Sequence, residues 1–159
     1  PILDALMDAG REYDIQPAGL ASRDTLRLEM GFCLYGNDID DSTSPLEAGL
    51  GWITKFVDGN DFIDRKYLEG QKEKGIRKKL VGFELNDRGI PRKDYPIMNE
   101  SGKRIGRVTS GTMSPFTSKA IGLGYVEMDF SMPGTTICIG IRNNLIHATV
   151  VKPPFIKQE

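Results

Sequence analysis

Apolar residues near the start of the chain recur at the spacing of a helix. Across residues 2–13 they stand three or four positions apart, with charged residues on the opposite side, which predicts an amphipathic helix. Across residues 20–30 a strand period and a helix period compete. We favour a helix there, because Leu, Arg, Glu and Met dominate, β-branched residues are scarce and Gly31 follows as a natural stop.

The next segment carries both loop and core signals. Residues 37–45 are polar and rich in turn formers, which predicts a loop, and their acidic residues lack the Gly and Glu spacing of a calcium-binding EF-hand. Residues 46–56 are apolar and include the only tryptophan, Trp52, whose side chain we expect in a core. Asp61 is then placed to cap a third helix that runs to about Gly75.

After Gly75 the pattern changes to short β-rich runs that are separated by Gly, Pro and Asn turns. The clearest hairpin has alternating isoleucines at 137–141, a turn at Asn143-Asn144 and a return strand from Leu145. The predicted strands are 79–86, 104–110, 120–128, 135–142 and 145–152. We expect their core to include Val81, Phe83, Ile105, Val108, Ile137, Ile139 and Val150.

These patterns predict an α+β protein with two parts. Residues 1–75 form the end of an α+β domain, and residues 76–159 form a small antiparallel β module, most simply a barrel, with a sandwich as the alternative. The chain begins with Pro1 rather than Met, inside a predicted helix that has no capping residue before it. We therefore expect a fragment of a longer protein.

Composition and charge remove several classes of function. The chain has 21 Lys and Arg against 22 Asp and Glu, so there is no overall basic field for nucleic acid. No apolar run approaches the roughly 20 residues of a membrane span, and the start lacks the pattern of a signal peptide. Cys33 and Cys138 are far apart and form no metal-binding spacing, which predicts two reduced, buried thiols in a cytoplasmic protein.

Few residues suggest catalysis. The single histidine, His147, has apolar neighbours and no nominated partner, so we expect a partly buried strand residue and no zinc site. Gly122 and Gly124 lack the third glycine of a dinucleotide motif, which favours strand or bulge positions. The basic run at residues 72–79 indicates a solvated linker, with docking of an acidic partner as the alternative.

Arg23 and Arg27 are the most specific candidates. They stand four residues apart, so on a helix their guanidinium groups lie on one face. A guanidinium in a mostly apolar segment needs a carboxylate or phosphate partner. That partner is either internal, such as Glu29 or a distant Asp, or the anionic group of a ligand, and the residues alone leave both readings open.

Longer stretches of sequence resemble the glycine cleavage T-protein, or aminomethyltransferase, family. The resemblance begins with Gly19-Leu-Ala-Ser-Arg-Asp-Thr-Leu-Arg-Leu-Glu29, Leu34-Tyr-Gly-Asn-Asp-Ile-Asp40 and Ser44-Pro-Leu-Glu-Ala-Gly-Leu-Gly-Trp52. It continues through Lys79–Phe83, Ile105–Pro115, Ile121–Val126 and Pro153–Phe155. It therefore covers nearly the whole chain and corresponds to the carboxy-terminal part of the family.

The resemblance implies a tetrahydrofolate-dependent transferase. Such an enzyme takes the aminomethyl group from the lipoyl arm of H-protein, releases ammonia and forms methylenetetrahydrofolate. Folate lies at the centre of a three-domain body, so residues 1–75 would be the end of the folate-binding domain and residues 76–159 the carboxy-terminal barrel. The family's catalytic carboxylate lies in the amino-terminal half, so we assign no catalytic residue and no metal ligand here, and we expect the isolated chain to be inactive.

One site residue carries over from the family. The family has an Ala-Arg-Asp motif whose arginine binds substrate, and the corresponding residues here are Ser22-Arg23-Asp24. The resemblance therefore implies that Arg23 binds substrate. Folate ends in a glutamate whose carboxylates match a guanidinium through two parallel hydrogen bonds. Arg27 is not assigned to the site.

Two other functions are compatible with parts of the resemblance. One is the folate domain of a dimethylglycine- or sarcosine-oxidising enzyme, which shares the Leu-Tyr-Gly word, and the other is a folate-binding relative without transferase activity. The chain shows no flavin-binding fingerprint. Agreement over the Ser-Pro-Leu-Glu and Val-Thr-Ser-Gly words favours the aminomethyltransferase.

Overall fold

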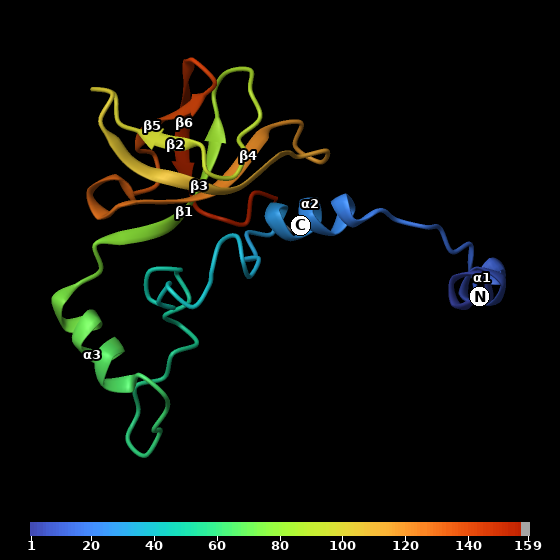
Figure 1. Ribbon diagram of the computed structural model, residues 1–159, viewed down its shortest axis with the longest axis horizontal. Coiled ribbons are helices and arrows are strands. Elements are labelled where there is room, and N and C mark those ends of the chain that lie inside the picture. The colour runs from blue at the N-terminus through green and yellow to red at the C-terminus, as the bar shows by residue number, and fades with distance from the viewer. Residues whose placement is uncertain (157–159) are drawn as a thin grey trace.

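The computed structural model describes residues 1–156. The alternating apolar residues of the second half of the chain build a closed antiparallel barrel (Figure 1). The sheet order is β1-β4-β3-β2-β5-β6, and β6 pairs back with β1. Each strand therefore has a hydrogen-bonded neighbour on both sides. The strands are β1 (Lys78–Leu85), β2 (Pro96–Met98), β3 (Arg104–Met113), β4 (Ala120–Glu127), β5 (Thr136–Ile141) and β6 (Asn144–Val151).

The barrel has its own hydrophobic core. It contains all seven residues that the alternation predicts, and none of them is more than 6% exposed. The predicted α+β class with a carboxy-terminal barrel is therefore confirmed. The last three residues of the predicted barrel domain, 157–159, lie outside the described residues.

The structure corrects two details of the predicted barrel. It contains β2, which the sequence analysis missed because three residues beginning with Pro96 are too few to show alternation, although Ile97 is fully buried. The β5–β6 hairpin is confirmed, but its turn is Arg142-Asn143 rather than Asn143-Asn144, because Ile141 pairs with Asn144. Arg142 adopts the left-handed conformation, with φ of 56°.

Gly122 and Gly124 are strand residues of β4, as predicted. Both face the neighbouring strand β3 at close approach. A Cβ atom on Gly122 would collide with the Phe83 ring and lie 2.9 Å from the carbonyl oxygen of Ser110. These glycines therefore allow the barrel wall to pack tightly.

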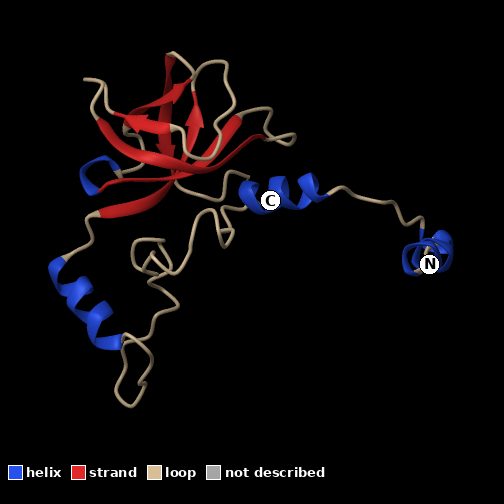
Figure 2. Cartoon of the chain, viewed as in Figure 1, coloured by secondary structure: helices blue, strands red, loops and turns tan. Residues whose placement is uncertain are grey.

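The first half of the chain forms an extended limb beside the barrel (Figure 2). Its helices are α1 (Ile2–Ala9), α2 (Leu20–Glu29) and α3 (Arg65–Lys74), and a short 3₁₀ helix at Arg11–Tyr13 completes the predicted 2–13 element. Helix α1 buries none of its residues and lies far from the barrel, at the end of an extended segment (Figure 1). None of the described helices has the length and apolarity to cross a membrane.

The start of the third helix differs from the prediction. Asp61 does not cap it, because the helix begins only at Arg65, after the left-handed residue Asp64. The Arg65 side chain binds the carbonyl oxygens of Val57 and Asn60, which holds the preceding residues in a turn. Helix α3 then ends at Lys74 and β1 begins at Lys78, so the predicted basic linker is reduced to residues 75–77.

The prediction of a buried Trp52 was wrong. Its side chain is 72% exposed, and among the surrounding residues 46–56 Ala48 is the one buried apolar residue. The segment is attached to the barrel mainly through its backbone, where Leu80 N donates to the carbonyl oxygen of Glu47 at 2.8 Å. Such an attachment leaves the large apolar side chains uncovered by the described residues.

Candidate functional site

Helix α2 is the one helix of the limb that packs on the wall of the barrel. Leu28 is fully buried against Ile121 and Leu123 of β4. At the next residue, the buried Glu29 carboxylate accepts hydrogen bonds from the Ser114 hydroxyl and the Phe116 amide. Both contacts lie near the carboxy-terminal end of α2 and fix its position.

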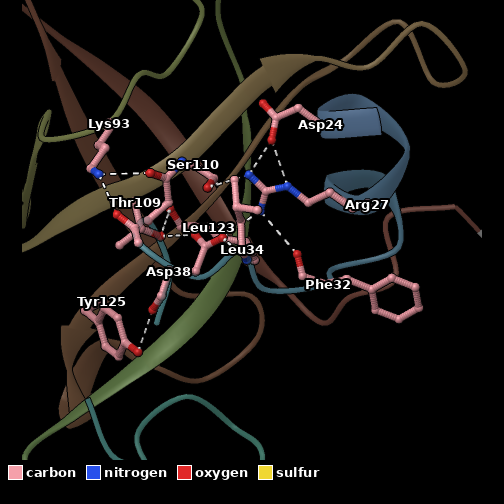
Figure 3. A network of polar contacts seen from close by, with 12 residues as sticks. Asp24, Arg27, Phe32, Leu34, Asp38, Lys93, Thr109, Ser110, Leu123 and Tyr125 are labelled. Atoms are coloured by element: carbon pink, nitrogen blue, oxygen red, sulfur yellow. Dashed lines mark hydrogen bonds and ion pairs between the residues drawn. The ribbon is translucent and has the colours of Figure 1, made fainter. Parts of the chain in front are cut away.

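Arg27 uses every donor that its side chain has (Figure 3). Nε and Nη2 donate to Asp24 Oδ1 at 2.8 and 2.6 Å, and Nη2 also donates to Ser110 Oγ at 2.8 Å. Nη1 donates to Asp38 Oδ2 at 2.6 Å and to the Phe32 carbonyl oxygen at 3.2 Å. A guanidinium offers five N–H groups, so Arg27 has no donor left for a ligand.

Asp38 is the fully buried partner of Arg27. Its carboxylate also accepts hydrogen bonds from Leu34 N, at 2.9 Å, and from the Thr109 hydroxyl, while its backbone carbonyl accepts one from Tyr125 Oη at 2.9 Å. The sequence left open whether each arginine has an internal partner or binds a ligand anion. For Arg27, the internal ion pair with a distant Asp is confirmed. Glu29, the other suggested partner, instead binds Ser114.

A β-bulge brings two neighbouring residues of β3 into this network. Val108 pairs with Gly124 and Ser110 pairs with Leu123, so Thr109 is the extra residue in β3. Adjacent residues of a regular strand point to opposite faces, and a bulge changes this direction locally. Thr109 and Ser110 can therefore both contact the limb, through Asp38 and Arg27 respectively.

The ionisable side chains beside the network are held in their neutral forms. Burial raises the pKa of Tyr125 to about 12, so its hydroxyl remains a donor to Asp38. Burial, and then the Asp38 charge, raise the pKa of the half-buried Cys33 thiol. A thiolate is the reactive form of cysteine, so Cys33 is poorly suited to act as a nucleophile.

Arg23, the predicted substrate-binding residue, lies one turn before Arg27 in a different environment. It is exposed, and its guanidinium has no hydrogen-bond or ion-pair partner within residues 1–156. It borders an open recess of about 320 Å³, whose other lining residues are Leu20, Ala21, Asp24, Leu34 and Asn37. A free guanidinium beside apolar surface is suited to binding a carboxylate. That Arg23 does so stays a prediction.

The sequence analysis missed Asp38 and Thr109 as parts of the network. They are 71 positions apart, and no local spacing signals their contact. The acidic residues of the 37–45 loop also do not converge on one point: Asp38 faces Arg27, whereas Asp40 accepts hydrogen bonds from Ser42. In the described part of the chain, no group of three or more His, Cys, Asp or Glu residues could hold a metal ion.

His147 and Cys138 lie away from this site. The prediction of a partly buried His147 was wrong, because the ring is exposed on β6, where Nδ1 lies 3.6 Å from Cys138 Sγ. Both cysteines are free thiols. Cys138 is buried as predicted, whereas Cys33 is only half-buried, so the prediction of a buried thiol was wrong for Cys33. His147 has apolar sequence neighbours because they point to the opposite face of the strand.

Comparison with known proteins gives concordant matches along the chain. Residues 78–157 match the family model of the glycine cleavage T-protein C-terminal barrel domain, and residues 1–58 match that of the GCVT N-terminal domain. A curated protein named aminomethyltransferase from Bacteroides thetaiotaomicron is 61% identical over 156 residues, which are 98% of this chain and 43% of that protein. An aminomethyltransferase from Porphyromonas gingivalis is 60% identical over 157 residues, with the same coverage of both chains.

A solved structure shares the fold. The crystal structure of glycine cleavage system aminomethyltransferase T from Bartonella henselae matches with a TM-score of 0.88 and 32% identity. The match covers 98% of this chain and 43% of that one. The chain thus spans less than half the length of these relatives.

Proposed function

Because this chain belongs to the glycine cleavage T-protein family, we propose that it forms part of a tetrahydrofolate-dependent aminomethyltransferase. This enzyme takes the aminomethyl group from the lipoyl arm of H-protein, releases ammonia and passes the one-carbon unit to tetrahydrofolate. The names of the relatives support this activity over a sarcosine-type oxidase or a non-catalytic folate binder. The two free thiols are compatible with the reducing cytoplasm.

The proposal for the site rests on the different environments of two arginines of α2. Arg27 is 10% exposed and fully hydrogen-bonded, whereas Arg23 is exposed and has no partner among the described residues. A surface arginine needs no partner, but this one borders a recess whose wall includes the side chains of Leu20 and Leu34. This recess can hold the glutamate tail of folate, with a carboxylate on Arg23 and the methylene groups on the apolar wall.

Tetrahydrofolate supplies the nitrogen atoms that accept the one-carbon unit. The contribution of this chain is to bind and orient the tail of that molecule. Arg23 donates two parallel hydrogen bonds to a tail carboxylate, and the planar guanidinium fixes the orientation as well as the position of the carboxylate. Arg27 holds α2 on the barrel, so that Arg23 projects from a fixed helix. We assign no proton transfer to any residue of this chain.

The test compares tetrahydrofolate with tetrahydropteroate, which lacks the glutamate. In the full-length protein we expect Arg23→Ala to weaken tetrahydrofolate binding by about ten- to a hundredfold, the effect of about 1.5–3 kcal/mol for a charge-assisted hydrogen bond. Binding of tetrahydropteroate and the denaturant midpoint remain unchanged. Arg23→Lys restores part of the affinity, because it keeps the charge but lacks the planar fork.

Arg11→Ala is a matched control, because Arg11 is an exposed arginine whose ion-pair partner, Asp8, is also exposed. It leaves the affinity for both ligands unchanged. A lower denaturant midpoint for Arg23→Ala with unchanged tetrahydrofolate affinity would show that Arg23 is structural.

A further inference from the structure

The recess beside Arg23 is also lined by Asn37, a polar residue that lies on a different element from Arg23. Asn37 belongs to the loop between α2 and the 46–56 segment, and it lines the recess together with Leu34 of the same loop. Lys93, from the loop between β1 and β2, donates to Asn37 Oδ1 at 2.9 Å and to the Gly36 carbonyl oxygen at 2.8 Å. A lysine of the barrel thus binds the tip of the loop (Figure 3).

The chemistry of this contact fixes the orientation of the Asn37 carboxamide. An ammonium group only donates hydrogen bonds, so the atom that faces Lys93 must be the carboxamide oxygen. The amide nitrogen, Nδ2, then keeps its two N–H donors, and it has no hydrogen-bond partner within residues 1–156. Asn37 therefore offers donors, rather than an acceptor, to a ligand in the recess.

The loop backbone is held at several points. Gly36 N donates to the Ile39 carbonyl oxygen and Asp38 N to that of Leu34, each at 2.8 Å. The buried side chain of Asp38 ties the loop to α2 and β3. The position of Asn37 is therefore restrained on both sides, by the hydrogen bonds of the neighbouring Asp38 and by the hydrogen bond from Lys93.

The charges around the recess also favour an anionic ligand. Asp24 is the one carboxylate in its lining, and Oδ1 of Asp24 accepts two hydrogen bonds from Arg27. Arg27 is shared between Asp24 and Asp38, so this ion pair offsets only part of the negative charge of Asp24. Arg23 has no ion-pair partner among the described residues, and the Asn37 amide is a neutral donor in the lining of the same recess.

We propose that Asn37 is a second carboxylate-binding residue of the Arg23 recess and that Lys93 is its positioning residue. The inference rests on the proposed function of Arg23. A carboxylate has two oxygens and about four lone-pair sites, so it can accept from a guanidinium and a carboxamide at once. The recess therefore selects ligands that carry a carboxylate tail, through donors from both α2 and the loop.

Asn37→Asp is the most informative variant. It keeps an oxygen for Lys93 to bind, so the loop stays attached, but it replaces the two N–H donors by a negative charge. In the full-length protein we expect more than a tenfold loss of tetrahydrofolate affinity, with tetrahydropteroate affinity and denaturant midpoint unchanged. Asn37→Leu, which removes the donors without adding charge, produces a loss of about tenfold.

Lys93 is tested by the same pair of ligands. Lys93→Met lets the carboxamide rotate and lowers tetrahydrofolate affinity about three- to tenfold, less than removal of Asn37 itself. Lys93→Arg restores the affinity because it still donates to Oδ1. In the Asn37→Leu background Lys93→Met has no further effect, since nothing remains to be oriented. Lys103→Met is the control, because it removes an exposed lysine paired with the exposed Glu127 and leaves both affinities unchanged.

The outcomes separate this inference from the proposal that it rests on. If Arg23→Ala lowers the tetrahydrofolate-to-tetrahydropteroate affinity ratio and Asn37→Asp does not, the role of Asn37 is refuted and that of Arg23 stands. An equal loss for both ligands in Asn37→Asp means a disturbed loop, which also overturns the inference. If no variant, Arg23→Ala included, changes the ratio, the recess does not bind the tail and both proposals fail.

Discussion

Replacing Arg27 by methionine tests whether the network of Figure 3 holds the limb on the barrel. Methionine keeps an unbranched, mostly apolar stem but removes all five N–H donors. The fully buried Asp38 carboxylate then retains two partners for its side chain, Leu34 N and the Thr109 hydroxyl. Neither partner carries a positive charge.

The structure sets the size and the location of the effect. An uncompensated buried charge destabilises by about 3–5 kcal/mol. Helix α2 buries two residues, Leu28 and Glu29, whereas the barrel has a separate core. We therefore expect local detachment of α2 and the 34–38 loop rather than unfolding of the barrel. Because about 1.4 kcal/mol corresponds to a factor of ten, the equilibrium constant for local opening rises by roughly 10²- to 10⁴-fold.

Amide hydrogen exchange measures this opening directly. The Leu34 amide donates to Asp38 Oδ2 at 2.9 Å, so its protection should fall by about that factor in Arg27→Met. The amide of Phe83, in the barrel core, should keep its protection. Asp38→Asn in the Arg27→Met background removes the uncompensated charge and restores part of the Leu34 protection.

Arg23→Met is the matched control on the same helix, because Arg23 has no partner among the described residues, and it should leave Leu34 protection unchanged. Unchanged Leu34 protection in Arg27→Met would refute the proposed role of the ion pair. An equal loss of protection at Leu34 and Phe83 would refute the local character of the opening.

Three further predictions concern the barrel, the activity and the pH dependence. A peptide of residues 77–152 should fold alone, because it contains the whole barrel core; a circular dichroism spectrum without β structure, or unprotected amides, would contradict this. The isolated 159-residue chain should show no aminomethyl transfer, because it supplies one wall of the proposed folate site; measurable turnover from aminomethyl-lipoyl H-protein would refute it. Burial raises the pKa of Tyr125 from 10.0 to about 12, so the unfolded chain loses this proton first and stability falls from about pH 10 to pH 12. Tyr125→Phe should remove that part of the fall in denaturant midpoint, and an unaltered alkaline profile in this variant would contradict the assignment.

Local sequence patterns were sufficient for most of the barrel. Alternation depends only on near neighbours, so it identified buried residues of β1, β3, β5 and β6, as Phe83 and Ile139 show. It identified none in β4, where nearly every residue is buried and nothing alternates. The same reasoning failed for β2, which is too short to alternate, and for Trp52, whose apolar neighbours indicated a core that the described residues do not provide. Hydrophobicity predicts that a side chain favours burial, but packing requires a second surface.

The sequence also identified the two arginines on α2, but their spacing did not assign their roles, and only the family resemblance pointed to Arg23 as the substrate-binding residue. Their spacing depends on helix geometry alone, whereas their environments depend on segments that are distant in the sequence. Asp38 reaches Arg27 because the loop folds back on α2, and Ser110 reaches it because the bulge at Thr109 redirects the strand. Contacts across 71 to 83 positions have no local signature. Only the tertiary structure therefore decided that Arg27 is fully bonded within the protein and that Arg23 has no partner among the described residues, because the distribution of partners in space, rather than residue type, determines which charge is satisfied.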